Sequence, residues 1–155
     1  MKKSVISKRN IIKAAAFLVA FLVLVPAARG QSDGMGVFMY MFGTERIPQG
    51  CGGQLKVTET KLVYQCEQLS VTIPYHAIKQ MEFRPRVSKQ IRKMKLAWVT
   101  KPTSIRSKHA GFFSVLYTHK GRTHAIIMKV SDNTLRPYMA EIDLKTGRSI
   151  ESGGY

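Results

Sequence analysis

The chain has 155 residues, and its 25 lysines and arginines outnumber its 9 aspartates and glutamates, which gives a formal net charge of +16. This length fits a single domain, and a hydrophobic content of 45% excludes general disorder. The 2 cysteines are too few for a disulfide-rich scaffold or for a zinc site built from four cysteines.

The N-terminal segment, residues 1–30, has the three-part layout of a secretory signal peptide. A basic leader precedes the unbroken apolar run Ala14–Val25, and small residues follow it, including Ala28 and Gly30. We therefore expect cleavage before Gln31 and export to the periplasm or the medium. The alternative is an inner-membrane anchor through residues 11–28, although the apolar run is short for a bilayer span of about 20 residues.

Residues 31–52 are predicted to form a lead-in segment ahead of the domain. Within it, the apolar run Val37–Phe42 is too short for a helix of ordinary length, and we interpret it as a buried strand or a docking segment. From Gln54 onward, apolar and polar residues alternate in the manner of half-buried strands. The predicted strands are residues 54–58, 62–66, 70–73 and 78–84. A single turn is predicted at 75–77, before the last of these strands.

Residues 87–98 allow two interpretations. The apolar residues that recur there at helical spacing are Val87, Ile91, Met94 and Trp98. Ser88 suits the residue that caps the start of a helix, so the preferred interpretation is a basic amphipathic helix. The alternative is a basic loop followed by a strand at 95–100.

A hairpin and a helix are predicted at the C-terminal end. Residues 111–118 and 123–130 are strongly strand-forming, and Gly121 in the turn between them tolerates a positive φ. A helix should start near residues 133–134, because proline is tolerated only in the first turn, and it should end at Gly147. The apolar stripe that predicts this helix consists of Leu135, Tyr138, Met139 and Ile142.

These elements predict a mainly β fold, in which a curved antiparallel sheet or partly open barrel is capped by one amphipathic C-terminal helix. Four short patterns spread over residues 53–150 mark its strands and turns, namely Gly53-x-Leu55, Leu62-x-Tyr64, Ile73-Pro74-Tyr75-x-x-Ile78 and Thr146-Gly147. With these patterns the chain resembles the pleckstrin-homology-like superfamily, including its GRAM-type and bacterial members. The domain is accordingly expected to span residues 53–155. A small up-and-down β-barrel is the alternative fold.

The resemblance does not extend to lipid-binding residues. Members of the superfamily that bind phosphoinositides carry clustered lysines and arginines around their first hairpin, where this chain offers only Lys56 and Lys61. Protein recognition is the other common role that the resemblance implies.

The two cysteines, Cys51 and Cys66, are expected to form a disulfide. A connection near residues 57–61 places them opposite or nearly opposite each other across a hairpin, within the Cα separation of about 4.4–6.8 Å that a disulfide requires. Export favours oxidation. Two buried free thiols are the alternative.

No catalytic or metal-binding constellation is recognisable in the sequence. His119 and His124 flank the predicted turn without an acidic residue beside them, and we interpret them as ordinary polar turn residues. No serine lies in a Gly-x-Ser-x-Gly elbow, and the glycine-rich stretch 50–53 lacks the Lys-Ser/Thr of a phosphate-binding loop. We therefore expect no catalytic residue, no metal and no cofactor.

The strongest remaining signal is a run of positive charge. No acidic residue occurs between Glu82 and Asp132. The candidate anion-binding residues within this stretch are Arg84, Arg86, Lys89, Arg92, Lys93, Lys95, Lys101, Arg106 and Lys108. The alternative interpretation of such a run is a solvated face that keeps the protein soluble.

Together these features predict an exported, non-enzymatic binding module. Its basic surface would engage anionic envelope lipid, an envelope phosphate surface or an acidic protein. Export argues against nucleic acid as the partner, and no apolar run beyond the leader is long enough to span a membrane. The alternative is a small exported hydrolase whose site the sequence does not reveal.

Overall fold

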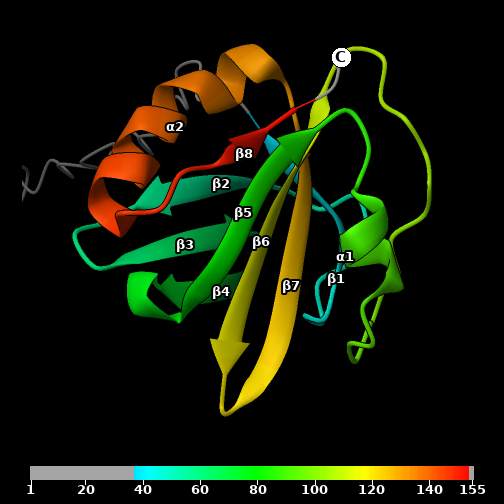
Figure 1. Cartoon of the computed structure of the whole chain (residues 1–155), viewed down its shortest axis with the longest axis horizontal. Helices are drawn as coiled ribbons and strands as arrows, with labels where there is room; N and C mark the ends of the chain where they lie inside the picture. The colour runs from blue at the N-terminus through cyan, green and yellow to red at the C-terminus, as the bar shows by residue number, and fades with distance from the viewer. Residues whose placement is uncertain (1–36, 154–155) are drawn as a thin grey trace, which may run out of the picture. The chain divides into compact units, whose positions relative to one another are not determined.

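The computed structural model describes residues 37–153, so the signal-peptide prediction for residues 1–30 lies outside the described range. Eight strands form one sheet in the order β4-β3-β2-β1-β7-β6-β5-β8 (Figure 1). They are β1 (Phe38–Gly43), β2 (Gly52–Val57), β3 (Lys61–Cys66), β4 (Leu69–Pro74), β5 (Ile78–Arg84), β6 (Gly111–His119), β7 (Arg122–Val130) and β8 (Glu151–Ser152). All neighbouring strands are antiparallel except β5 and β8.

The sheet is curved but not closed, because β4 and β8 remain as its two edges. The helix α2 (Asp132–Thr146) covers one end of it, on the side where β2 meets β3 (Figure 1). The predicted fold class, a mainly β domain with a C-terminal helix, is therefore confirmed. The alternative of a small closed up-and-down barrel is wrong.

The strand β1 explains the apolar run near the start of the described chain. It pairs with β2 on one side and β7 on the other, so it is central to the sheet, and it lies within the predicted lead-in at 31–52. A shift in its register between Tyr40 and Phe42 places Tyr40 in one apolar cluster and Phe42 in another. Phe38, Tyr40 and Phe42 are buried, whereas Met39 on the opposite face is 39% exposed.

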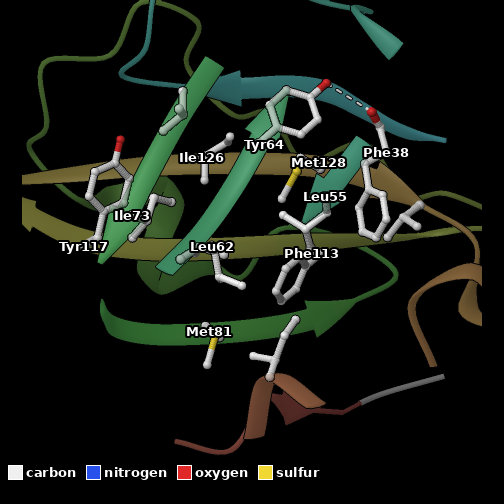
Figure 2. Close-up of a cluster of buried hydrophobic side chains, with 14 of the residues drawn as sticks. Phe38, Leu55, Leu62, Tyr64, Ile73, Met81, Phe113, Tyr117, Ile126 and Met128 are labelled. Carbon is white, nitrogen blue, oxygen red and sulfur yellow. Dashed lines mark hydrogen bonds between the residues drawn. The ribbon is translucent and has the colours of Figure 1, made fainter. Parts of the chain in front are cut away.

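The main core lies between the curved sheet and α2. Figure 2 shows how Leu55, Leu62, Met81, Phe113 and Met128 converge on it from separate strands. The predicted stripe of α2 faces this core, with Leu135 and Ile142 buried and Tyr138 and Met139 half-buried. Burial of large apolar side chains, each worth about 1.5–3 kcal/mol, holds the helix against the sheet.

One end of α2 differs from the prediction. Ser131 caps its start and accepts a hydrogen bond from Thr134 N at 3.2 Å, so the predicted start near residues 133–134 is wrong. Pro137 consequently lies inside the helix rather than in its first turn. The stabilisation that this cap provides offsets the loss of the one backbone hydrogen bond that proline cannot donate. The predicted end at Gly147 is confirmed, with a left-handed φ of 64°.

A disulfide joins Cys51 to Cys66, as predicted, with a Cα separation of 6.1 Å. It connects the segment that precedes β2 to the end of β3. Tyr64 reinforces this corner, because its hydroxyl donates to Cys51 O at 2.8 Å and to Phe38 O at 3.1 Å (Figure 2). Within the described residues, no helix is both long and apolar enough to cross a membrane.

A second apolar cluster covers the other face of β1, β6 and β7. Its buried members are Phe42, Val87, Ile91, Phe112, Leu116, Ala125 and Ile127. Met94, Leu96 and Trp98 pack against it from the long connection between β5 and β6. These apolar residues fasten the basic connection, which carries α1 (Lys89–Lys93), to the sheet (Figure 1).

The helix α1 is much shorter than the helix predicted over residues 87–98. Ser88 caps its start as expected, accepting from Ile91 N at 3.3 Å. At Met94 the backbone turns extended, and the chain then meets the end of β1, where Thr100 N donates to Gly43 O at 3.1 Å. The helix prediction is therefore wrong beyond residue 93, because bonds to β1 replace those of a helix. The alternative strand at 95–100 is reduced to one isolated bridge.

Candidate functional site

The structure gathers five of the nine candidate anion-binding residues around one cavity of about 600 Å³. These five, which we call the cavity cations, are Arg84, Arg86, Lys89, Arg92 and Arg106. They come from the end of β5, from α1 and from the later part of the long connection. The remaining lining residues are uncharged, so within residues 37–153 no carboxylate side chain lies on the cavity wall.

A buried acid forms hydrogen bonds with two residues that line the cavity. Glu82 on β5 is 1% exposed. One of its carboxylate oxygens accepts from Ser88 N at 3.1 Å, and the other accepts from Arg84 Nε at 3.3 Å. Glu82 thus holds the turn into α1 and orients the first cavity cation. A buried carboxylate needs such partners, since an unpaired charge in an apolar interior is very costly.

Contacts with the backbone position two further cavity cations, Arg92 and Arg106. Arg92 donates from Nε to Val87 O at 3.1 Å, which folds its side chain back over the start of α1. Ser107 N donates to Pro85 O at 2.8 Å, which returns the long connection to the end of β5 and brings Arg106 to the cavity. Residues distant in sequence therefore share one positive site.

Most of this positive charge is uncompensated within the described residues. Arg84 pairs with Glu82 and, at 3.7 Å, with Glu151. No ion pair to an acid is found in residues 37–153 for Arg86, Lys89 or Arg106, all of which are exposed. Like charges that line a concave surface add their fields there, so the described side chains give this cavity a positive potential.

The other four candidate residues lie outside this cavity. Lys93 and Lys101 are exposed on the long connection, and Lys108 lines a neighbouring cavity that also contains Asp132. Lys95 belongs to a different cavity on the β6–β7 side. The nine residues therefore form one concentrated group of five and four dispersed charges rather than a single row along a helix.

Two apolar side chains are exposed on the same connection. Val99 is 53% and Ile105 62% exposed. Ile105 directly precedes Arg106. Exposed aliphatic side chains interleaved with bases are typical of surfaces that contact the headgroup region of a membrane.

A second polar cluster, which sequence reasoning missed, lies where β1 ends beside β7. Gly43 permits the close approach of the two backbones, because a Cβ there would lie 2.5 Å from Ala125 O. Thr44 N donates to the same carbonyl oxygen at 2.9 Å. The chain held in this way brings Glu45 to His124, with 2.9 Å between Glu45 Oε1 and His124 Nδ1.

Two tyrosines extend this cluster into the core. Tyr117 donates its phenol proton to Glu45 Oε1 at 2.5 Å, and Tyr40 donates to Glu45 O at 3.0 Å. Burial, followed by the hydrogen bond to Glu45, raises the pKa of Tyr117, and burial and the same carboxylate raise the pKa of Tyr40. His119 lies beside His124, with 5.7 Å between ring centroids. The interpretation of these histidines as turn residues without an acid is wrong, because folding supplies Glu45.

The chemistry available to this cluster is binding or proton transfer by an oriented imidazole. Thr44 Oγ1 lies 3.2 Å from His124 Nδ1, but it also accepts from Ala125 N at 3.1 Å, which ties the hydroxyl to the backbone. Among residues 37–153, no three His, Cys, Asp or Glu side chains are grouped to hold a metal ion.

No protein-family model matches the chain, and a comparison with curated proteins finds no relative.

Proposed function

We propose that this chain is an exported, non-enzymatic binding module whose basic face meets an anionic lipid surface of the cell envelope. The basic face consists of the five cavity cations together with residues 99–108. The observation that carries the proposal is the convergence of Arg84, Arg86, Lys89, Arg92 and Arg106 on one cavity, to whose wall the described part of the chain contributes no acidic side chain.

Export is supported by two independent features. The N-terminal thirty residues have the layout of a cleavable signal peptide. The Cys51–Cys66 disulfide is of a kind that persists in oxidising compartments and is rare in the cytosol. The order of the strands and the C-terminal helix also support our proposal that the domain is pleckstrin-homology-like.

Lipid is favoured over an acidic protein by the exposed side chains of Val99 and Ile105. Each base close to an anionic membrane contributes about 1 kcal/mol, so three exposed cavity cations provide about 3 kcal/mol before any apolar contact. An acidic protein would pair with the same charges, but it would also need an apolar pocket that fits the side chain of Ile105. Headgroups and acyl chains accept such a side chain without a fixed geometry.

Co-sedimentation with vesicles tests this proposal. The mature protein should bind vesicles that contain phosphatidylglycerol at low salt and should be released as salt rises, because screening acts over about 10 Å at 0.1 M. The variant R86Q/K89Q/R106Q should lose most of the binding. It leaves Arg92 in place, because the Nε contact to Val87 O is structural.

The matched control is K56Q/K61Q/K79Q, which removes the same number of charges from exposed lysines on β2, β3 and β5. This control should bind vesicles nearly as well as the parent. Equal losses in both variants would mean that net charge alone drives binding. No binding by the parent, with capture by an acidic protein instead, would replace lipid by protein as the partner.

A small exported hydrolase is the second candidate function, and one observation favours it. Nδ1 of His124 contacts the carboxylate of Glu45, and His124 lines an open cavity. General bases share this arrangement. Turnover of ester or phosphoester substrates by the parent, abolished in H124Q, would favour this function over a binding module.

A further inference from the structure

The cavity beside His124 is distinct from the one lined by the cavity cations. It lies at the β6–β7 turn, has a volume of about 700 Å³ and is closed on one side by Leu96 and Ala97 from the long connection. We call it the His124 cavity. Its lining combines two imidazoles, three cationic side chains and a short apolar wall.

The contacts of His124 fix which ring nitrogen serves the cavity. Nδ1 faces Glu45 Oε1 at 2.9 Å and Thr44 Oγ1 at 3.2 Å, and the ring stacks on Tyr117 with 5.5 Å between centroids. With a carboxylate as its partner, Nδ1 is the protonated nitrogen, and the opposite nitrogen, Nε2, makes no hydrogen bond to any residue in the 37–153 range. The ring is thus held while one nitrogen stays available.

The charges around this nitrogen are positive. Lys95, Lys120 and Arg122 line the same cavity, and none of them forms an ion pair with an acid in the described part of the chain. Lys120 has a positive φ of 49°, because the turn between β6 and β7 is only two residues long. That tight turn keeps Lys120 and Arg122 at the rim.

We propose that the His124 cavity binds a small organic anion, whose carboxylate accepts from Nε2–H of a charged His124 and from the rim cations. The apolar part of the ligand would pack against Leu96 and Ala97. Glu45 has a positioning role, since its carboxylate contacts Nδ1 and orients the ring. This site is independent of the basic face, so either proposal can fail alone.

The protonation form of His124 decides what Nε2 offers to a ligand. In the imidazolium form both ring nitrogens donate, whereas in the neutral form with Nδ1 donating to Glu45, Nε2 is an acceptor and opposes an anion. The groups closest to the ring are Glu45, His119 and Tyr117, and the cationic side chains around the cavity are Lys95, Lys120 and Arg122.

Benzoate is a suitable probe because it combines an ionised carboxylate with an apolar ring. In a titration followed by NMR, the His119 and His124 ring resonances should shift as benzoate is added. Inorganic sulfate, which has no apolar part, should bind more weakly than benzoate.

Three variants test the assignment. H124Q should weaken benzoate binding, and its amide can still donate to Glu45, which favours folding. K120Q/R122Q changes only exposed rim residues and should also weaken benzoate binding. H76Q, an exposed histidine on the single turn Tyr75–Ala77, should behave as the parent.

A dissociation constant for benzoate that is the same in H124Q and in K120Q/R122Q as in the parent would overturn the proposal. So would resonance shifts centred on the cavity cations.

Discussion

Glu82 is the residue on which the basic site most depends, so its replacement by glutamine should be costly. The change keeps the size of the side chain and removes its charge. One oxygen remains to accept from Ser88 N, but the new amide group faces Arg84 Nε, another donor, across the 3.3 Å contact. The variant therefore loses one charge-assisted hydrogen bond and gains a donor–donor conflict at a position that is 1% exposed.

The size of the effect follows from this geometry. A hydrogen bond to a charged group contributes about 1.5–3 kcal/mol. Arg84 is itself partly exposed and retains Glu151 as a partner, so we expect a loss of about 2 kcal/mol in the free energy of unfolding for E82Q. The matched control E151Q alters the other partner of Arg84, whose side chain is 54% exposed, and should cost about 0.5 kcal/mol or less.

Urea-induced unfolding, followed by circular dichroism, measures both values. The variant E82Q should unfold at a lower urea concentration with an unchanged slope, and E151Q should unfold almost where the parent does. If the two variants lose the same stability, or if E82Q loses none, then Glu82 does not organise the start of the basic connection.

Two further predictions concern the disulfide and the buried phenols. Because Cys51 and Cys66 are 15 residues apart, reduction should lower the free energy of unfolding by about 3 kcal/mol; an unchanged urea midpoint in dithiothreitol would contradict this. The pKa values of Tyr40 and Tyr117 are raised above 10.0 in the folded chain by burial and by Glu45, while in the unfolded chain these phenols titrate near their ordinary value of about 10. The folded state therefore binds more protons above pH 10, so stability should fall from pH 9 to pH 11, and Y117F should reduce that fall. An equal fall in Y117F and the parent would show that Tyr117 does not contribute.

Local patterns predicted the strands and the hairpin well because each depends on neighbours in the sequence. The alternation around Leu62 and Tyr64 and the two-residue turn at Gly121 are signals of this kind. The helix over residues 87–98 failed for the opposite reason. Its apolar stripe does pack into the second apolar cluster, through Ile91, Met94 and Trp98. Hydrogen bonds from residues 99 and 100 to Gly43, however, determine the backbone conformation after residue 93.

The candidate sites, too, were predictable only where the signal is local in the sequence. The excess of bases was visible in the sequence, whereas their convergence depends on Glu82 and on the Ser107–Pro85 contact. His124 and Glu45 lie 79 positions apart and meet only because β1 pairs with β7. The one signal in the sequence was an acid, Glu45, two residues after the end of an apolar strand.

In the proposed function the basic face, and not the protein's charge in general, contacts an anionic membrane. Paramagnetic relaxation from spin-labelled lipid in phosphatidylglycerol nanodiscs tests it most directly. We predict that amide signals of residues 84–93 and 99–108 broaden, with Ile105 among the most affected, while those of β3 and β4 persist. Broadening centred on β3 and β4, or spread evenly over residues 37–153, would contradict the account.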